Sequence, residues 1–464
     1  MGCGSSSTAN SVADGYPSTT STSKTQLGSV DLGPAGFNKY TNDMARLSVA
    51  DSVATSSMAG GWISPLNEGD TKEHEDLQFI CNTDVTLEWL YQRITEKFKC
   101  PNEPEPQWIA ERLNTISDKD LDQTTVLRVT FGWENEEEEK LPKSIILKIC
   151  VQQSQDVTDD MKLAQRMFLK ECNVYEWLSK QKKIVVPQIY VIKKHPTEAG
   201  NGVIIMEDMA EHGHAGQLAE GLSVEAVRGL LQIFAQIHAT SMKTDKWTTM
   251  IAPNSPFFYK QTVQFAKTTL DNWPDFDPNK IQMFSKFLTQ EYLSNTESET
   301  CEQLNVPQCL VHGNPAPNSC FFNGNEQVEA IIDWTHTHPG CYAEDVAKAI
   351  CWNLSPQQRH EQLIRLLEHY HFHLIKNLGS PNDALDIDQV KKAYNIFLPV
   401  AAVKFLLFLP EKLEDHDAAI MERATSLITD ALVVSSQTHQ EEKPEVKQSD
   451  SRRESQQLSH RILT

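Results

Sequence analysis

The sequence predicts an α+β protein of two lobes, with a small β-rich lobe at residues 77–207 and a larger helical lobe at residues 208–435. Short apolar runs bounded by turn residues are concentrated in the first half of the chain, whereas helical periodicity dominates the second half. Both ends are polar and lack a sustained apolar period. We therefore expect a flexible tether at residues 1–76 and a disordered tail at residues 436–464.

The composition of this 464-residue chain argues against several classes of protein. Its formal net charge of -21 is unlike that of a general nucleic-acid binder, because phosphate contacts need clustered Lys and Arg. The cysteines include no Cys-x-x-Cys pair, so neither a zinc site nor a disulfide framework is predicted. Four of them lie in apolar surroundings and are expected to be buried free thiols in a reducing cytosol: Cys81, Cys150, Cys172 and Cys351.

The small lobe is expected to contain two helices and four strands. Val126–Trp133 and Ser144–Cys150 are rich in β-forming residues and are joined by the acidic segment 134–139, which predicts a hairpin. The remaining elements are a helix capped by Asn82-Thr83-Asp84 that buries Leu87, Leu90 and Ile94, a helix at Met161–Lys180, and strands at Val185–Lys193 and Gly202–Met206.

The second lobe carries four stretches with helical periodicity and three short strands. One helix has a clear end, because Gly379 follows it and glycine readily adopts the left-handed conformation found at helix C-termini. The apolar run from Phe397 to Leu409 is interrupted by Pro399 and Lys404, so a buried helix is predicted rather than a membrane span. The helices are Val224–Met242, Pro278–Ser294, Pro356–Leu378 and Ile387–Leu409, and the strands surround Leu310–Val311, Cys320–Phe322 and Val328–Ile332.

Polar residues follow two of these short strands. His312-Gly313-Asn314 comes directly after Leu310–Val311, and Asp333 follows the last strand. In the small lobe, Lys148 interrupts an apolar strand, where an ammonium group is costly unless it is paired or used. Glu171 on the next predicted helix is a suitable partner. The alternative is a lysine that reaches water at a strand end, beside an ordinary surface glutamate.

These residues resemble the CHK kinase-like group, which is related to ecdysteroid kinases, choline kinases and aminoglycoside phosphotransferases, over roughly residues 80–430. The resemblance implies a two-lobed protein-kinase-like fold. It also implies that Lys148 and Glu171 form the pair that grips nucleotide phosphates, and that Glu207 lies at the hinge where adenine stacks. The stretch Gly340–Asp345 resembles a family segment whose final aspartate opens a helix and supports the catalytic loop.

In that family the loop reads His-Gly-Asp. Its aspartate accepts the proton of the substrate hydroxyl, and a later aspartate holds magnesium. By resemblance, His312 is the loop histidine, Asn314 stands at the position of the catalytic base, and Asp333 is a magnesium ligand. Ser319 stands at the second metal-binding position, which is usually an asparagine, and Asn318 lies one position early.

Three features depart from the pattern of an active kinase. The amide of Asn314 cannot act as a base near neutral pH, and positioned general-base catalysis is worth about 10² to 10⁴ in rate. Ser319 replaces an amide ligand of the metal, and segment 115–125, where a phosphate-covering loop is expected, contains no glycine. The chain is therefore predicted to be a pseudoenzyme with weakened sites for ATP and magnesium. The alternative is an active ATP- and magnesium-dependent phosphotransferase that acts on a hydroxyl of a choline-like, sterol or other lipid-like molecule.

The amino terminus, Met1-Gly2-Cys3-Gly4-Ser5-Ser6, fits the pattern for myristoylation of Gly2. Cys3 beside it is a candidate for palmitoylation, and two acyl chains anchor a protein stably where one does so only marginally. The alternative is a small, flexible, unmodified terminus. We expect the acylated protein at the cytoplasmic face of a membrane and the unmodified protein in the cytoplasm.

Overall fold

The computed structural model describes the greater part of the chain between Gln78 and Glu441, all of it within one unit, Gly61–Thr464. Several predictions fall outside the described residues: the tether with Gly2 and Cys3, the cap residue Asn82, the acidic segment 134–139, residues 115–123 of the glycine-free segment, and residues 442–464 of the tail. The described residues are 78–81, 83–100, 105–114, 124–133, 140–150, 158–181, 184–194, 202–273, 276–379, 385–409 and 418–441.

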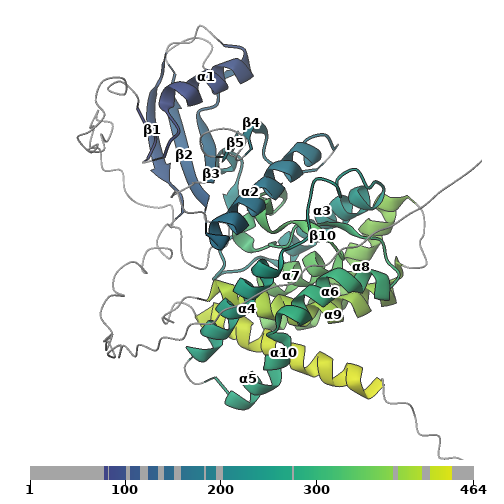
Figure 1. The fold of residues 1–464 in the computed structure, drawn as a ribbon. Helices are drawn as coiled ribbons and strands as arrows, with labels where there is room; N and C mark the ends of the chain where they lie inside the picture. Colours follow the sequence, from purple (N-terminus) through teal and green to yellow (C-terminus); the bar gives the residue numbers. More distant parts are fainter. Residues whose placement is uncertain are drawn as a thin grey trace, which may run out of the picture. The chain divides into compact units, whose positions relative to one another are not determined.

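The small lobe contains α1 Leu87–Phe98, β1 Gln107–Arg112, β2 Thr124–Gly132, β3 Ser144–Cys150, α2 Asp159–Leu178, β4 Ile189–Lys193 and β5 Gly202–Glu207. Its strands form one antiparallel sheet in the order β1-β2-β3-β5-β4 (Figure 1). The predicted hairpin is confirmed, because β2 pairs with β3 in antiparallel register and Val126 lies opposite Lys148.

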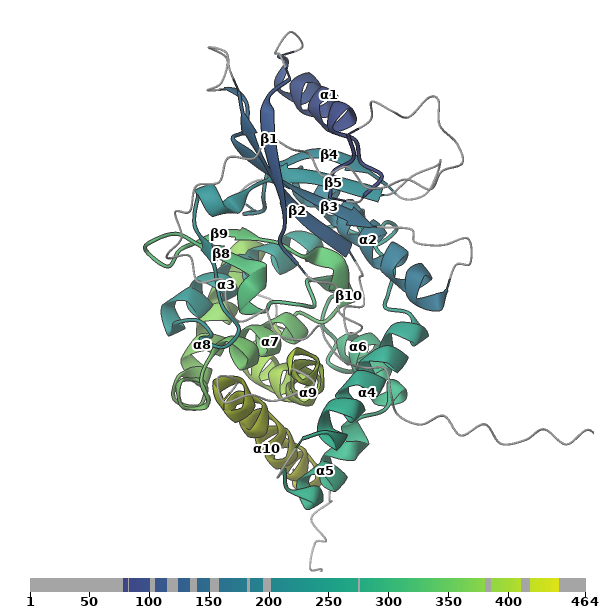
Figure 2. The same cartoon turned by 90° about the vertical axis from the view of Figure 1, so that its left-hand side faces the viewer.

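Alternation along the strands gives this sheet two different apolar faces. Leu127, Leu147 and Ile205 belong to a core that the sheet shares with α1. The opposite face includes Ile204 and joins the core of the helical lobe, to which α2 also belongs. Figure 2 shows α1 on the side of the sheet away from the helical lobe. Lys148 neighbours Leu147 in the strand and therefore lies on the face toward that lobe.

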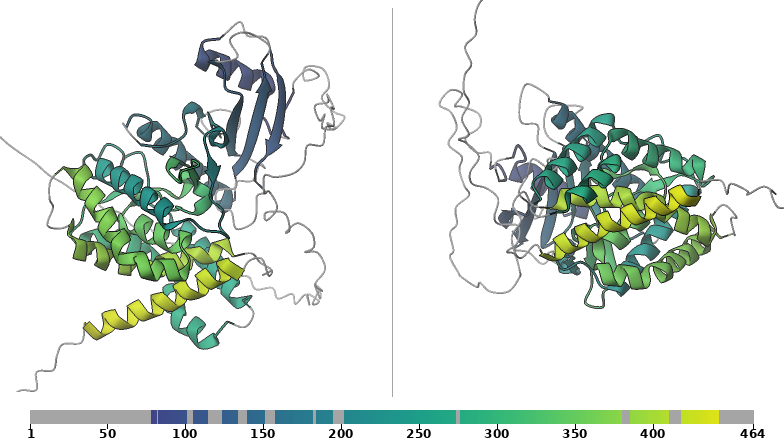
Figure 3. Two further views of the ribbon diagram at one scale, coloured as in Figure 1. Left: turned by 180° about the vertical axis from the view of Figure 1, so that it is seen from behind. Right: turned by 90° about the horizontal axis from the view of Figure 1, so that it is seen from below.

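The second lobe is mainly helical, with α3 Val224–Met242, α4 Pro256–Asp271, α5 Pro278–Phe284, α6 Gln290–Gln303, α7 Ala343–Asn353, α8 Pro356–Leu378, α9 Ile387–Phe405 and α10 Ala418–Glu441. This lobe also contains two small sheets. One is formed by β6 His214–Ala215, β8 Cys320–Phe322 and β9 Val328–Ile331, and the other pairs β7 Cys309–Val311 with β10 His338–Gly340. Helix α10 packs along α9 and α5 on the side away from the large sheet (Figure 3). The two-lobed α+β architecture expected from the sequence, a small β-rich lobe followed by a larger helical lobe, is confirmed. None of the described helices combines the length and the apolar character needed to cross a bilayer.

Capping chemistry explains why α3 and α8 have the bounds that the sequence predicts. The Ser223 hydroxyl accepts the backbone N–H of Ala226 at 3.1 Å ahead of α3. Ser355 and Gln358 form a reciprocal capping box at the start of α8, and Gly379 ends that helix at φ +82°. These are local signals, so they can be recognised without knowledge of the tertiary fold.

Three predicted helix boundaries were wrong. The expected helix Pro278–Ser294 is divided, because Leu288 leaves the helical conformation and the Thr289 hydroxyl caps a new helix, α6, by accepting the Tyr292 N–H at 3.0 Å. Helix α1 is capped by Thr86 rather than by residues 82–84. Helix α9 ends at Phe405 and is followed by a 3-10 turn at Leu406–Phe408, short of the predicted end.

The strand predictions erred where tertiary contacts override the local pattern. β4 begins at Ile189 rather than Val185, because Pro187 has no N–H to donate and the Val185 carbonyl accepts the Ile331 N–H at 3.1 Å. Strands β1, β6 and β10 and helices α4 and α10 were not predicted at all, and α10 continues to Glu441, into the tail that was predicted to begin at Ser436. β1 is an edge strand of mostly exposed residues and lacks an apolar alternation. Cys150, Cys172 and Cys351 are buried as expected, but Cys81 is only partly buried.

Candidate functional site

The structure brings Lys148 on β3 together with Glu171 on α2, with 2.8 Å between Nζ and Oε2. Both side chains are buried. The other carboxylate oxygen of Glu171 accepts the backbone N–H of Trp334 at 3.3 Å. One ion pair therefore links the sheet, helix α2 and the segment that follows β9.

Asp333, two residues after the end of β9, has both carboxylate oxygens engaged by protein donors. Oδ1 accepts from Lys148 Nζ at 3.2 Å and from the Thr335 hydroxyl at 2.9 Å. Oδ2 accepts from Asn314 Nδ2 at 2.8 Å. Asp333 also adopts φ +63°, a left-handed conformation that non-glycine residues keep only when their surroundings fix it.

Electrostatics keep Asp333 ionised. Burial acts to raise the pKa of this carboxyl, but the charge of Lys148 and weaker effects that include the hydrogen bond from Thr335 outweigh it, so the pKa lies well below its usual range. Asp333 is thus an anion whose negative charge faces a lysine on the opposite lobe. A phosphate group would have to compete with Asp333 for Lys148.

The amide of Asn314 has a fixed orientation. Its Nδ2 group donates to Asp333, and a flipped amide would instead point its oxygen at an ionised carboxylate, which is repulsive. An aspartate at position 314 would place a second carboxylate against the first, an arrangement that requires either a bridging cation or a shared proton. The amide removes that requirement.

His312 is buried and both of its ring nitrogens are occupied within the loop. Nδ1 accepts the backbone N–H of Asn314 at 3.1 Å, so the proton of the neutral ring resides on Nε2, which donates to the Ile332 carbonyl at 2.9 Å. Burial lowers the pKa of His312 and keeps the ring neutral. In this conformation His312 holds the loop in shape and offers no free nitrogen to a ligand.

Helix α7 fixes the other side of the loop. The Asp345 carboxylate accepts the backbone N–H groups of His312 at 2.7 Å and Gly313 at 2.8 Å, and it also contacts His238 Nε2 at 3.1 Å. Lys348, one turn further along α7, donates to the Gly313 carbonyl at 2.7 Å. The support that the resemblance assigned to the aspartate of Gly340–Asp345 is therefore present as three contacts to a single carboxylate.

The donor set around Asp333 does not fit a magnesium ion in this conformation. Magnesium prefers carboxylate, phosphate and water oxygens in an octahedral arrangement. The carboxylate of Asp333 already accepts three hydrogen bonds, one of them from an ammonium group. Ser319 is buried in the 3-10 turn Pro317–Ser319, and its neighbour Asn318 is exposed to solvent.

Glu207 ends β5, as expected for a residue at the hinge between the lobes. Its carboxylate accepts the backbone N–H of Gln188 at 2.9 Å and contacts His212 Nε2 at 3.0 Å. The next residue, Asp208, was not singled out from the sequence, yet it is buried and pairs with Arg128 on β2 at 2.6 Å. The hinge is therefore tied to the sheet by a second ion pair.

A cluster of buried charges lies behind the loop. Lys404 on α9 bridges Glu297 on α6 and Glu344 on α7, Glu344 also contacts Lys348, and His338 Nε2 lies 3.0 Å from Glu344. The oxygens and nitrogen of Glu297, His338 and Glu344 converge as in a metal site. However, two ammonium groups already balance the two carboxylates, so a divalent cation would bring excess positive charge into a buried place.

The charged cluster was missed because its members are far apart in the sequence. One usable signal was present, since Lys404 interrupts an apolar helix in the same way that Lys148 interrupts an apolar strand. A buried lysine needs a partner, and in both cases the partner is a carboxylate on another element. Thr335 gave no such signal, because a threonine is unremarkable in any loop.

Lys170 extends the cluster toward α2 and should give stability a distinctive pH dependence. Its Nζ donates to Asn254 Oδ1 at 2.9 Å, and Asn254 donates to Glu297 at 3.0 Å. Burial lowers the pKa of Lys170 to about 7, whereas an unfolded lysine has a pKa near 10.4. At a pH between these two pKa values, Lys170 is protonated in the unfolded chain but largely neutral in the folded protein. The free energy of unfolding therefore rises with pH, by at most about 1.4 kcal/mol per pH unit from this residue.

The measurement is urea unfolding of wild type and Lys170→Met between pH 7 and 10. Groups that titrate in the same way in both proteins do not affect the difference between their free energies of unfolding. The stability of wild type relative to the variant should increase across this window. A difference that is independent of pH would show that Lys170 does not change its protonation there.

Comparisons with known proteins place the chain in context. A family model, DUF1679, described as "Uncharacterized oxidoreductase dhs-27", matches residues 79–432. No curated protein matches the sequence. Similar solved structures include a putative aminoglycoside phosphotransferase from Ralstonia eutropha (12% identity, 76% of this chain and 97% of that chain, TM-score 0.45) and a choline kinase from Cryptosporidium parvum (12% identity, 72% and 90%, TM-score 0.47). A Plasmodium vivax ethanolamine kinase is also similar (15% identity, 75% and 89%, TM-score 0.40). With such TM-scores these similarities carry no conclusion about activity.

Proposed function

This chain belongs to the DUF1679 family, and we propose from its site that it is a kinase-like pseudoenzyme that does not transfer phosphate. One observation carries the proposal: both carboxylate oxygens of Asp333 are occupied by protein donors, including the amide that stands where an active kinase has its base. The oxidoreductase in the family description finds no support here. Every strand pairing in the described sheets is antiparallel, unlike the parallel sheet that binds dinucleotides in Rossmann-type oxidoreductases.

Of the three groups that phosphoryl transfer needs, one is missing and the other two are engaged by protein partners. A base is lacking because the amide of Asn314 does not accept a proton at neutral pH. Asp333, at the metal-ligand position, already accepts three hydrogen bonds, and Lys148, at the phosphate-holding position, is shared between Glu171 and Asp333. Nucleotide binding is therefore expected to be weak and independent of magnesium. The resemblance of this loop to the loop of active kinases thus supports the location of the site more than it supports phosphoryl transfer there.

Restoring the base tests this proposal. Wild type should transfer no phosphate from labelled ATP to choline, ethanolamine, sterols or lipids in the presence of magnesium. Asn314→Asp should create slow transfer, because it restores a proton acceptor and a second carboxylate for the metal. The double variant Asn314→Asp with Ser319→Asn should be faster, since it adds back the amide ligand. Transfer by wild type that disappears in Asp333→Ala would show instead that the chain is an active phosphotransferase.

We also propose that the amino terminus is acylated and holds the protein at the cytoplasmic face of a membrane. The support is the sequence pattern at Gly2 and Cys3. In cells, Gly2→Ala should move the protein from the membrane fraction to the soluble fraction, because it removes the myristoyl acceptor. Cys3→Ser should weaken the association, since a single acyl chain binds marginally. Membrane association that survives Gly2→Ala would refute acylation as its cause.

A further inference from the structure

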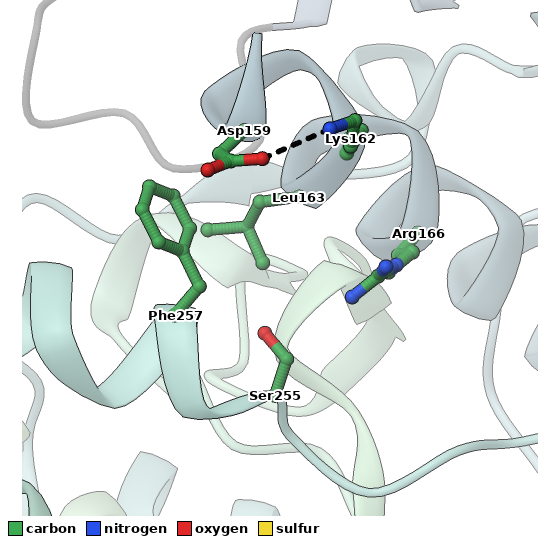
Figure 4. Close-up of a pocket in the computed structure, with 6 residues that line it drawn as sticks. All are labelled: Asp159, Lys162, Leu163, Arg166, Ser255 and Phe257. Atoms are coloured by element: carbon green, nitrogen blue, oxygen red, sulfur yellow. Dashed lines mark hydrogen bonds and ion pairs between the residues drawn. The ribbon is translucent and has the colours of Figure 1, made fainter. Parts of the chain in front are cut away.

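A hollow of about 170 Å³ lies between the first half of α2 and the start of α4 (Figure 4). It is separate from the candidate site, since none of its lining residues contributes to the contacts of Lys148, Asp333 or the loop. The lining residues are Asp159, Lys162, Leu163, Arg166, Ser255 and Phe257.

The lining is positively charged in a chain whose formal net charge is -21. Lys162 pairs with Asp159 at 3.0 Å, but within the described part of the chain no carboxylate lies in ion-pair distance of Arg166. A third cation, Lys260, lies over the ring of Phe257 at 5.9 Å from its centroid. The lining itself therefore contains one acidic residue and two cations, and the guanidinium of Arg166 is available for a planar, two-oxygen contact with an anion.

The opposite part of the lining is apolar. Leu163 is a buried lining residue, and Figure 4 shows it beside the Phe257 ring, with the Arg166 side chain on its other side. The Ser255 hydroxyl already has a structural partner, because it accepts the Phe258 N–H at 3.2 Å and so caps α4. The hollow thus combines a cationic side with an apolar wall.

Polar contacts outside the hollow hold its two walls together. Gln261 on α4 donates to Asp160 on α2 at 2.6 Å, and Lys170 on α2 donates to Asn254, just before α4, at 2.9 Å. The first contact lies beside the lining residues of α2, and the second lies one turn beyond Arg166. Because the walls are fixed before any ligand arrives, binding does not require them to be ordered first.

We propose that this hollow binds a small anionic amphiphile, a phosphate or carboxylate group that carries a short apolar body. Arg166 and Lys162 contact the anionic group, and Leu163 and Phe257 cover the apolar body. The volume is below the roughly 300 to 1,000 Å³ of pockets for drug-sized ligands, so the site suits a head group with a few carbons. The source is either a free metabolite or the head group of a membrane lipid.

The test uses the full-length, unacylated protein, with calorimetric titration of butyl phosphate, inorganic phosphate and butanol. Butyl phosphate should bind saturably, and at least about tenfold more tightly than either inorganic phosphate or butanol, because it engages both sides of the hollow. Arg166→Gln should weaken its binding about tenfold, as expected for the loss of one charge-assisted hydrogen bond. Arg365→Gln is the matched control, since Arg365 is also exposed on a helix but lies on α8, and this variant should bind like wild type.

Vesicles of phosphatidylcholine with and without phosphatidic acid distinguish the two sources. Sedimentation with phosphatidic-acid vesicles that is lost in Arg166→Gln assigns the site to a lipid head group. Binding of butyl phosphate without vesicle binding assigns it to a free molecule. Binding of butyl phosphate that is equal in wild type and Arg166→Gln, or no tighter than that of inorganic phosphate, would overturn the proposal.

Discussion

Gly313→Ala should destabilise the protein by roughly 3 kcal/mol or more. Gly313 has φ +83°, and a Cβ atom there would lie 2.5 Å from the His336 carbonyl oxygen. The left-handed conformation costs an alanine roughly 1 to 2 kcal/mol, and forcing an atom into a packed site adds about 1 to 3 kcal/mol. The loop cannot relax easily, because Asp345 accepts the backbone N–H of Gly313 and Lys348 donates to its carbonyl. Urea unfolding followed by circular dichroism measures the loss.

Gly379→Ala is the matched control for that experiment. Gly379 has φ +82°, nearly the same conformation, but its Cβ would meet no atom within 4 Å. The control should therefore lose only the roughly 1 to 2 kcal/mol of the conformational term. Equal losses in the two variants would show that the loop yields to the clash and is less rigid than its contacts indicate.

Lys404→Met should cost roughly 3 to 5 kcal/mol of folding stability. The ammonium of Lys404 bridges the carboxylates of Glu297 and Glu344, and all three side chains are buried. Burial acts to lower the pKa of Lys404, but the two carboxylates outweigh it and raise the pKa, so the lysine stays charged at any physiological pH. Removing it leaves two buried carboxylates with one fewer counterion, the situation in which a broken buried ion pair is most costly.

The control for Lys404→Met is the same substitution on the same helix. Lys391 on α9 pairs with Asp388 at 3.1 Å, but both side chains are exposed. Lys391→Met should therefore change the free energy of unfolding by less than about 1 kcal/mol. A small effect of Lys404→Met would mean that Glu297 and Glu344 take up protons at little cost, and the charged cluster would then contribute little to holding α6, α7 and α9 together.

The site was predictable where a residue conflicts with its local surroundings. Lys148 in an apolar strand demanded a partner, and the structure provides Glu171 and Asp333. In the same way, Ser355 and Gly379 carry their own helix signals and marked the ends of α8 within the sequence.

Other features depend on contacts that no local pattern records. Strand β1 is held by its pairing with β2 rather than by its own apolar periodicity. The break between α5 and α6 needed the recognition of Thr289 as a cap inside a periodic run. Above all, the substitution at Asn314 indicated only a lost base. The structure adds that the amide donates to Asp333 and so supplies a hydrogen bond where a metal ion would otherwise be needed.

The central claim is that the site is complete without a metal ion, and magnesium dependence of nucleotide binding tests it most directly. Calorimetric titration of ADP into wild type and Asn314→Asp, each in magnesium and in excess EDTA, separates the contributions. We expect the wild-type affinity for ADP to be the same in both buffers, whereas Asn314→Asp should bind ADP more tightly with magnesium. Wild-type binding that strengthens with magnesium, and loses this dependence in Asp333→Ala, would contradict the account.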